Sequence, residues 1–274
     1  MSAPALPALR FVPAESLVLH EDADPRRVAK LVERLRLEAT LRNPPIVAPM
    51  GNASYVVLDG ANRVSGLRAL AVAHPVVQVV DYDQVELSTW HHLVTGLNWT
   101  TFFDALCAVP GVRLTPTDLL TAREALVRRR CLAFVVSPAD EVFTLDNGSS
   151  LRDSARLLLD ISNLYRGDGA IHRIRLDNVR ALSGMYDRIT AILVYPRFTR
   201  QDILELARAH ARVPTGITRH IIPGRVLRIN LPLAGMADPR PLAEKNAWLE
   251  AWMRGKFADH SIRFYAESTY SFDE

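Results

Sequence analysis

The first clear pattern along the chain is an amphipathic helix that begins near residue 24. Asp24 and Pro25 supply an N-capping acid followed by proline, which is favoured at the first helical position. Val28, Leu31 and Leu35 then recur at helical spacing, and the opposite face is basic. The pattern predicts a helix that packs through one side.

Two apolar runs follow this helix and predict a pair of joined strands. Residues 46–48 and 55–58 are rich in strand-forming residues, and Gly51 and Asn52 between them form a turn pair. The second run leads directly into D-G-A-N-R at 59–63, after which a short helix is expected through Leu70. Residues 76–80 predict a further strand.

The rest of the chain continues to alternate between helix-like and strand-like patterns of hydrophobic residues. Residues 88–97 are less regular. Strands are expected at 131–137 and 141–145, which form a hairpin, and at 189–195. Two further short strands are expected within 215–233, on either side of a hinge at Pro223 and Gly224. Helices are expected from Thr115 and Pro116 to the basic cluster 128–130, over 150–165, from Thr199 to about 211, and over 239–256. This alternation predicts an α/β (α+β) fold, and a weak composition shift near residue 100 divides it into domains at 1–100 and 101–274.

Composition narrows the class of protein only slightly. The hydrophobic share of 49% is enough for a sizeable core, and a net charge of +3 permits an anionic ligand without indicating nucleic acid. Cys107 and Cys131 lie in apolar surroundings, and two such residues predict neither a disulfide framework nor a zinc site. No signal peptide or membrane-spanning run is expected, so the predicted location is the cytoplasm.

The D-G-A-N-R segment is the strongest candidate for chemistry. Gly60 lets the backbone approach a ligand closely, and the first amides of the following helix point outward, unpaired, at the positive end of the helix dipole. Arg63 adds a planar fork suited to phosphate oxygens. Asp59 would repel an anion unless a metal or a proton donor mediates, which suggests Mg²⁺. The segment predicts a nucleotide-phosphate site.

The order of elements around this segment resembles the ParB/sulfiredoxin-like superfamily. In that superfamily a glycine-arginine turn at this place binds nucleotide phosphates, which implies a nucleotide-binding domain at 1–100 with Gly60, Ala61, Asn62 and Arg63 as the binding residues. The turn has no cysteine, so repair of cysteine sulfinate is not expected. Under this resemblance residues 101–274 form an α/β domain that completes the substrate site.

Three further segments resemble the free L-serine kinases of this superfamily: LHEDADPRR at 19–27, VDYDQVELSTWHH at 80–92 and PTGITRHIIPGR at 214–225. The resemblance implies transfer of a phosphoryl group from ADP or ATP to free L-serine, giving O-phospho-L-serine for cysteine or siderophore-precursor synthesis.

The resemblance also implies a role for each matched residue. Glu21 becomes the general base on the serine hydroxyl, and Asp59 holds Mg²⁺ or helps to orient that hydroxyl. Trp90 and His91 frame the serine, although His92 stands beside His91 and either ring could face the site. The residues that grip the transferred phosphate are Thr218, Arg219, His220 and Arg225.

Two other classes of function compete with the kinase. The first is a nucleotide-dependent DNA-binding or partition-type protein, supported only by the basic cluster Arg128 to Arg130, which a solvated helix end explains as well. The second is a catalytically inactive regulator that senses a nucleotide or an amino acid. Binding to nucleic acid or to a membrane is not expected, and the oligomeric state stays open.

Overall fold

The computed structural model describes residues 6–146, 150–167 and 169–262. Residues 1–5, on which the expectation of no signal peptide partly rests, lie outside this range. Within it the chain forms two compact units. Of the described residues, unit 1 comprises 6–19, 23–86 and 221–262, and unit 2 comprises 20–22, 87–146, 150–167 and 169–220.

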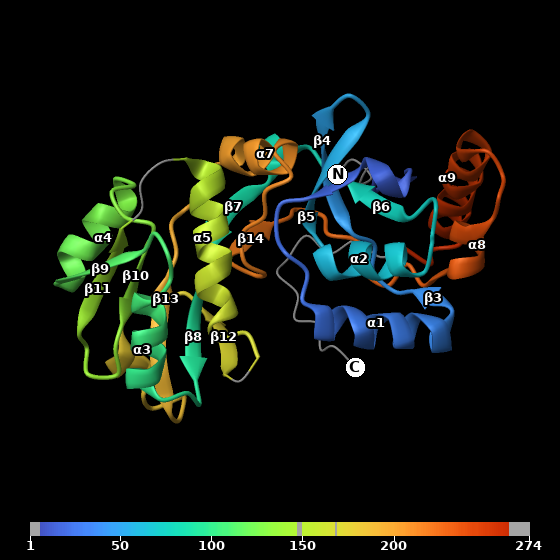
Figure 1. The fold of residues 1–274 in the computed structure, drawn as a ribbon. Coiled ribbons are helices and arrows are strands. Elements are labelled where there is room, and N and C mark those ends of the chain that lie inside the picture. The colour runs from blue at the N-terminus through green and yellow to red at the C-terminus, as the bar shows by residue number, and fades with distance from the viewer. Residues whose placement is uncertain (1–5, 147–149, 168, 263–274) are drawn as a thin grey trace. The chain divides into compact units, whose positions relative to one another are not determined.

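A five-stranded mixed sheet forms the centre of unit 1 (Figure 1). Its strand order is β1 (Leu9–Phe11), β6 (Val76–Val79), β4 (Ile46–Gly51), β5 (Ser54–Asp59) and β2 (Leu17–Leu19). β4 and β5 are antiparallel, whereas β6 runs parallel to β4 and β2 runs parallel to β5. β5 is therefore an interior strand, with β4 and β2 as its neighbours. Its last residue, Asp59, begins the candidate phosphate-binding turn.

Helices cover this sheet and complete the core of unit 1. α1 (Pro25–Glu38) packs against α2 (Ala61–Ala69), and α9 (Leu242–Ala258) packs against β1, where the Asn246 side chain bonds both backbone groups of Phe11. One core cluster joins Phe11, Leu67 and Met253 from these elements. The smaller elements of the unit are β3 (Thr40–Leu41), β15 (Leu231–Pro232), α8 (Leu233–Ala237) and the 3₁₀ turns η1 (Ala14–Ser16) and η2 (Tyr82–Gln84).

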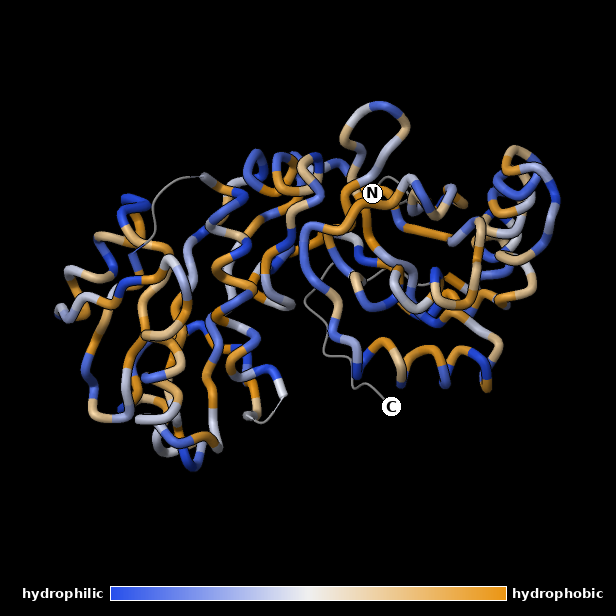
Figure 2. The backbone as a smooth tube through the Cα atoms, in the orientation of Figure 1, coloured by the Kyte–Doolittle hydropathy of each residue, from blue (hydrophilic) through white to orange (hydrophobic). Residues whose placement is uncertain are grey.

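Unit 2 is built on a six-stranded antiparallel sheet. Its order is β12 (Ala170–Ile174), β8 (His91–Thr95), β13 (Ile189–Val194), β10 (Ala133–Val136), β11 (Val142–Asp146) and β9 (Arg113–Thr117). Hydrophobic residues dominate its central strands, as Figure 2 shows, because both faces are covered. A separate two-stranded sheet pairs β7 (Glu86–Thr89) with β14 (Thr218–Ile221).

The helices of unit 2 divide between the two faces of the large sheet. α4 (Leu119–Val127) and α6 (Val179–Leu182) share a core cluster with Leu93 and Ile192, which point to one face. α5 (Leu151–Asn163) crosses the other face and contacts α7 (Arg200–Arg208), and α3 (Trp99–Cys107) lies on the same side (Figure 1). None of the helices among the described residues is long and apolar enough to cross a membrane.

The predicted α/β fold is confirmed, and most predicted elements match the structure. The helices at 25–38, 61–69 and 151–163, and the hairpins β4–β5 and β10–β11, form where expected. Thr199 and Asp202 make a full capping box for α7, and Asp24 caps α1.

Two expectations about elements were wrong. Thr115 and Pro116 lie in the edge strand β9, and the helix begins only after Asp118, which caps α4. Residues 88–97, read as irregular, contain the ends of β7 and all of β8. The two short strands expected within 215–233 do form, as β14 and β15 on either side of Pro223 and Gly224.

The two units are discontinuous in the sequence, whereas the predicted domains 1–100 and 101–274 are continuous. The segment 221–262 belongs to unit 1 because α9 packs on β1 and because Gln78 of β6 bonds Gly224 and Val226. The composition along the chain does not predict that the C-terminal segment packs on unit 1.

Candidate active site

The turn between β5 and α2 has a backbone that favours glycine. Gly60 caps the helix with φ +101°, in the left-handed region that side chains rarely adopt. A Cβ at this position would lie 3.0 Å from Nε of Arg63. Gly60 therefore permits both the turn and the close approach of the Arg63 guanidinium.

The start of α2 presents backbone amides that the helix does not use. Val64 N donates to Gly60 O, the first bond of the helix, so the amides of Ala61, Asn62 and Arg63 have no partner within it. The Asn62 side chain is already engaged, since its Oδ1 accepts a bond of 2.9 Å from Asp24 N. Asn62 thus ties this turn to the N-terminus of α1, and the remaining backbone amides are the groups of the turn suited to an anion.

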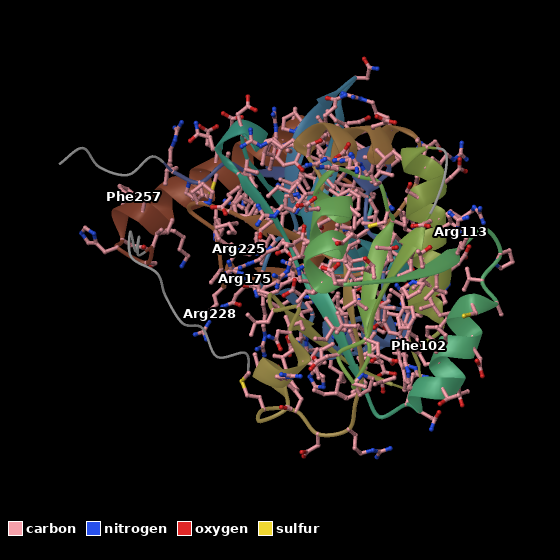
Figure 3. All side chains as sticks on the ribbon, turned by 90° about the vertical axis from the view of Figure 1, so that its left-hand side faces the viewer. Phe102, Arg113, Arg175, Arg225, Arg228 and Phe257 are labelled. Carbon is pink, nitrogen blue, oxygen red and sulfur yellow. The ribbon has the colours of Figure 1, made fainter. Side chains whose placement is uncertain are left out.

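Asp59 is clamped by two arginines within unit 1. Arg63 Nη2 lies 2.9 Å from Asp59 Oδ2, and Arg225 (labelled in Figure 3) donates to the same oxygen. Burial alone would raise the pKa of the Asp59 carboxyl, but the charges of Arg63 and Arg225 outweigh it and hold the pKa below its ordinary value. The carboxylate is therefore ionised and charge-neutralised, which makes it a weak base.

Arg63 has protein acceptors on both terminal nitrogens. Nη1 donates to the backbone oxygens of Asn43 (3.2 Å) and Pro44 (2.6 Å), while Nη2 reaches Asp59. The side chain is held against the turn and adds a fixed positive charge beside the helix amides. Its predicted contact with the donor phosphates stays a prediction.

In unit 2, Glu21 is fixed by a loop that lies far away in the sequence. Gly216 N donates to Oε2 (3.0 Å), and Thr218 donates to Oε1 through both its backbone N (2.8 Å) and its hydroxyl. We call Gly216 and Thr218 the Glu21 anchor. All three donors are neutral, so the carboxylate is oriented without an opposing charge, and the residue remains partly exposed.

The hydroxyl of Thr218 also fixes the tautomer of a buried histidine. His20 Nε2 lies 3.0 Å from Thr218 Oγ1. Because that hydroxyl gives its one proton to the Glu21 carboxylate, His20 Nε2 must be the donor. The His20 ring also meets the edge of the His220 ring, with centroids 5.3 Å apart.

Strand alternation in β14 separates residues that the sequence analysis grouped. Thr218 and His220 are buried on the side of His20, whereas Arg219 lies over the Trp90 ring at 4.5 Å. Arg225 belongs to unit 1. The four residues predicted to bind the transferred phosphate therefore form three groups with different partners: Thr218 with His220, Arg219, and Arg225.

The two adjacent histidines of β8 point to opposite faces of the large sheet. His91 Nδ1 accepts a bond from Tyr195 N, and its charged neighbours are Asp177 and Arg197. His92 Nδ1 bonds the Tyr165 hydroxyl at 2.9 Å on the α5 face, where Gly216 is also a neighbour. His92, rather than His91, thus lies on the side of the Glu21 anchor.

Burial keeps both rings uncharged. Desolvation lowers the pKa of His91 to about 4, with Asp177 opposing the shift. Desolvation, helped by the charge of Arg173, lowers the pKa of His92 to about 3. Both rings are therefore neutral at physiological pH, which suits packing and hydrogen bonding rather than binding of a phosphate through charge.

Sequence reasoning missed the groups that surround the Glu21 segment. Asp22 pairs with Arg166 at 2.6 Å and lies 3.7 Å from Arg212, and Thr215 Oγ1 donates to its backbone oxygen. The sequence signal for this loop is the Thr-Gly pair at 215–216. Gly216 has φ +75°, so a glycine is favoured there for its backbone alone.

No cluster of three or more His, Cys, Asp or Glu residues suited to a metal occurs among the described residues. Asp59 is one carboxylate whose Oδ2 already serves two guanidiniums. Because Mg²⁺ in kinase sites is held by one or two carboxylates together with substrate phosphates, a single Asp59 oxygen fits an ion that arrives with a nucleotide. It does not fit a metal held by protein ligands alone.

Comparisons with known proteins point to one group. Over 263 residues the chain is 26% identical to the ATP-dependent L-serine kinase SbnI of Staphylococcus aureus, covering 96% of both chains. An ATP-dependent L-serine kinase of Staphylothermus marinus is 31% identical over 89 residues, which is 31% of this chain and 35% of the relative. No family model matches.

Solved structures show the same fold. A C-terminally truncated SbnI from Staphylococcus aureus has a TM-score of 0.68 at 22% identity, covering 92% of this chain and 97% of that one. A free serine kinase in complex with AMP has a TM-score of 0.71 at 18% identity, covering 86% of this chain and 98% of that one. The fold is therefore shared along nearly the whole chain.

Proposed function

We propose that this chain, which belongs to the family of L-serine kinases, transfers a phosphoryl group from a nucleotide to the hydroxyl of free L-serine. The products are O-phospho-L-serine and the shortened nucleotide. Because the proposed substrates are free serine and a nucleotide, we place the reaction in the cytoplasm.

The observation that carries the proposal is the anchored Glu21 carboxylate. Phosphoryl transfer consists mainly of positioning and charge neutralisation, with a carboxylate that takes the proton of the attacking hydroxyl. Glu21 is partly exposed and held by three neutral donors from Gly216 and Thr218. We assign it as the base: it accepts the serine proton while the serine oxygen forms a bond to phosphorus and the bond to the leaving nucleotide oxygen breaks.

The turn at Asp59 to Arg63 supports nucleotide binding by unit 1. The amides of Ala61, Asn62 and Arg63 face outward at the positive end of α2, and Gly60 allows close approach. We assign these amides to the donor phosphates, with Arg63 and Arg225 supplying the fixed positive charge around Asp59. The low pKa of Asp59 argues against its use as a second base.

Mg²⁺ is proposed as part of the donor complex. When bound, the ion neutralises charge on the phosphate oxygens. Asp59 is the residue of this chain that would contact it, while Arg63 and Arg225 keep the Asp59 carboxylate ionised and oriented.

We further propose that Trp90, Arg219 and His92 contribute to the serine and phosphate environment in unit 2. Arg219 stacked on Trp90 presents a cation whose position is set by the aromatic face. Thr218 and His220 act on the other side of β14, through Glu21 and His20.

The test is identification of the product with each donor in turn. Purified protein is incubated with L-serine, MgCl₂ and either ATP or ADP, and the amino acid and nucleotide products are resolved by mass spectrometry. The proposal expects O-phospho-L-serine with ADP released from ATP, or with AMP released from ADP. Nucleotide hydrolysis that does not depend on serine, or no turnover with both donors, would overturn it.

A further inference from the structure

Arg173 lies directly against the loop that holds Glu21. A Cβ built on Gly216 would come within 2.2 Å of Arg173 Nε and Nη2, so the guanidinium occupies the space beside the glycine. Arg173 is the cross-strand partner of His92 and shares its face of the sheet, the face on which Gly216 is a neighbour of His92. The Arg173 guanidinium therefore lies beside Gly216, the residue whose amide donates to Glu21 Oε2.

This guanidinium differs from the other cations around Glu21. Arg166 and Arg212 pair with Asp22, and Arg219 stacks on Trp90. Arg173 is exposed, and no hydrogen bond or ion pair joins its side chain to another described residue. Its planar fork of donors is thus available to an anion from solvent.

We infer that Arg173 binds the α-carboxylate of the amino-acid substrate, an assignment that rests on the proposed function. In serine the carboxylate lies one carbon away from the carbon that bears the hydroxyl. If Glu21 takes the hydroxyl proton, two negative groups meet at Glu21, and a cation must lie beside the pair to offset their repulsion. The geometry gives that position to Arg173, whose fork matches a carboxylate with two parallel bonds.

The alternative anion for Arg173 is the phosphate being transferred. Arg219, Arg63 and Arg225 already supply cations for phosphates in the proposed mechanism, whereas no other unpaired guanidinium among the described residues contacts the Glu21 anchor. A carboxylate partner also predicts a simple chemical signature, because serine can be replaced by L-serinamide, which keeps the hydroxyl and ammonium groups but has no carboxylate.

The experiment compares binding of L-serine and L-serinamide by calorimetry in wild type, Arg173→Gln, Arg173→Lys and Arg152→Gln. Wild type should bind L-serine more tightly than L-serinamide. Arg173→Gln should weaken L-serine binding by about 10- to 100-fold, the range for a charge-assisted bond, and leave L-serinamide binding unchanged. Arg173→Lys should restore part of the preference, since it keeps the charge without the fork.

Arg152 is the matched control, because it is another exposed arginine of unit 2 whose side chain makes no hydrogen bond or ion pair with the described residues. Its variant should behave as wild type. Equal losses for both ligands in Arg173→Gln, or no preference for L-serine in wild type, would overturn the assignment. An active wild-type kinase with an unaffected Arg173→Gln variant would refute this inference alone, whereas a wild type that forms no O-phosphoserine would refute the proposed function.

Discussion

Glu21 and Asp59 are both carboxylates in candidate sites, but their partners give them different chemistry. Asp59 shares one oxygen between two guanidiniums, and the charges of Arg63 and Arg225 lower its pKa. Among the described residues, Glu21 accepts bonds only from two backbone amides and one hydroxyl. A base must gain a proton during the reaction, and neutral donors oppose that gain less than cations do. The local partners therefore favour Glu21 as the base and Asp59 as the group that organises the arginines.

Replacing Arg63 with alanine should weaken nucleotide binding by about 1.5–3 kcal/mol, the range for hydrogen bonds to charged groups. The variant removes a positive charge beside the α2 amides and also frees the carbonyls of Asn43 and Pro44. Calorimetric titration with ATP and ADP measures the change. Arg42→Ala, which breaks the Glu38 pair in the same unit, is the control and should leave affinity unchanged. Equal affinity in wild type and Arg63→Ala would remove Arg63 from the nucleotide site.

At the scale of elements, the β5–α2 turn depends on a glycine for two separate reasons. Gly51 in the β4–β5 hairpin shares the positive φ, at +92°, but a Cβ there would meet nothing within 4 Å. Gly60 also has a positive φ, and a Cβ there would lie 3.0 Å from Nε of Arg63. Comparing the two positions separates backbone strain from disruption of the phosphate turn.

Gly60→Ala and Gly51→Ala should each lower the free energy of unfolding by about 1–3 kcal/mol, the cost of a strained backbone position. Only Gly60→Ala should also weaken nucleotide binding, because the new methyl group displaces Arg63. Denaturant melts and nucleotide titrations measure the two effects. If both variants bind nucleotide equally well, the turn does not contact the donor.

The sequence predicted elements well wherever a local rule decided the structure. Capping by Asp24, the capping box at Thr199 and the hairpin turns are all determined by neighbouring residues. Thr115 and Pro116 misled because proline is also tolerated in edge strands, and β9 is at the edge of its sheet. Asp118, which caps the helix that does form, lies two residues after Pro116.

Much less of the candidate site could be predicted from the sequence, because its contacts join residues that lie far apart in the chain. Glu21 and Thr218 are 197 positions apart, and no spacing rule joins them. The resemblance to the serine kinases named both residues, but it assigned Thr218 to the phosphate and did not pair it with Glu21. The opposite orientations of Arg219 and Thr218 required knowledge that 218–221 is a strand, and the role of Gly216 required the position of Arg173.

For the whole molecule, the neutral histidines of unit 2 predict a loss of stability in acid. Burial lowers the pKa of His92 to about 3 and of His91 to about 4, whereas the unfolded chain takes up these protons near pH 6.5. Below pH 6.5 the unfolded state therefore binds more protons, and the free energy of unfolding falls by about 1.4 kcal/mol per pH unit for each histidine. The loss continues until the folded pKa is reached.

Denaturant melts between pH 7 and pH 5 measure this dependence. His92→Asn should show a shallower slope than wild type, while His210→Asn, at an exposed position, should keep the wild-type slope. An unchanged slope in His92→Asn would contradict the assignment of His92 as a buried neutral ring.

Glu21, the proposed base, belongs to unit 2, whereas the proposed nucleotide turn belongs to unit 1. Loss of the base should therefore affect turnover while sparing nucleotide binding, which is the separation that a kinase mechanism requires. Glu21→Gln keeps the size of the side chain and one of the two oxygens that accept bonds from the anchor, but it cannot take the serine proton.

The most direct measurement is the rate at which wild type and Glu21→Gln form O-phospho-L-serine from L-serine and the preferred donor, with nucleotide affinity measured on the same samples. We expect wild type to form the product and Glu21→Gln to be slower by about 10²- to 10⁴-fold, the usual contribution of a general base, with nucleotide affinity unchanged. Near wild-type turnover in Glu21→Gln, or no product from wild type, would contradict the account.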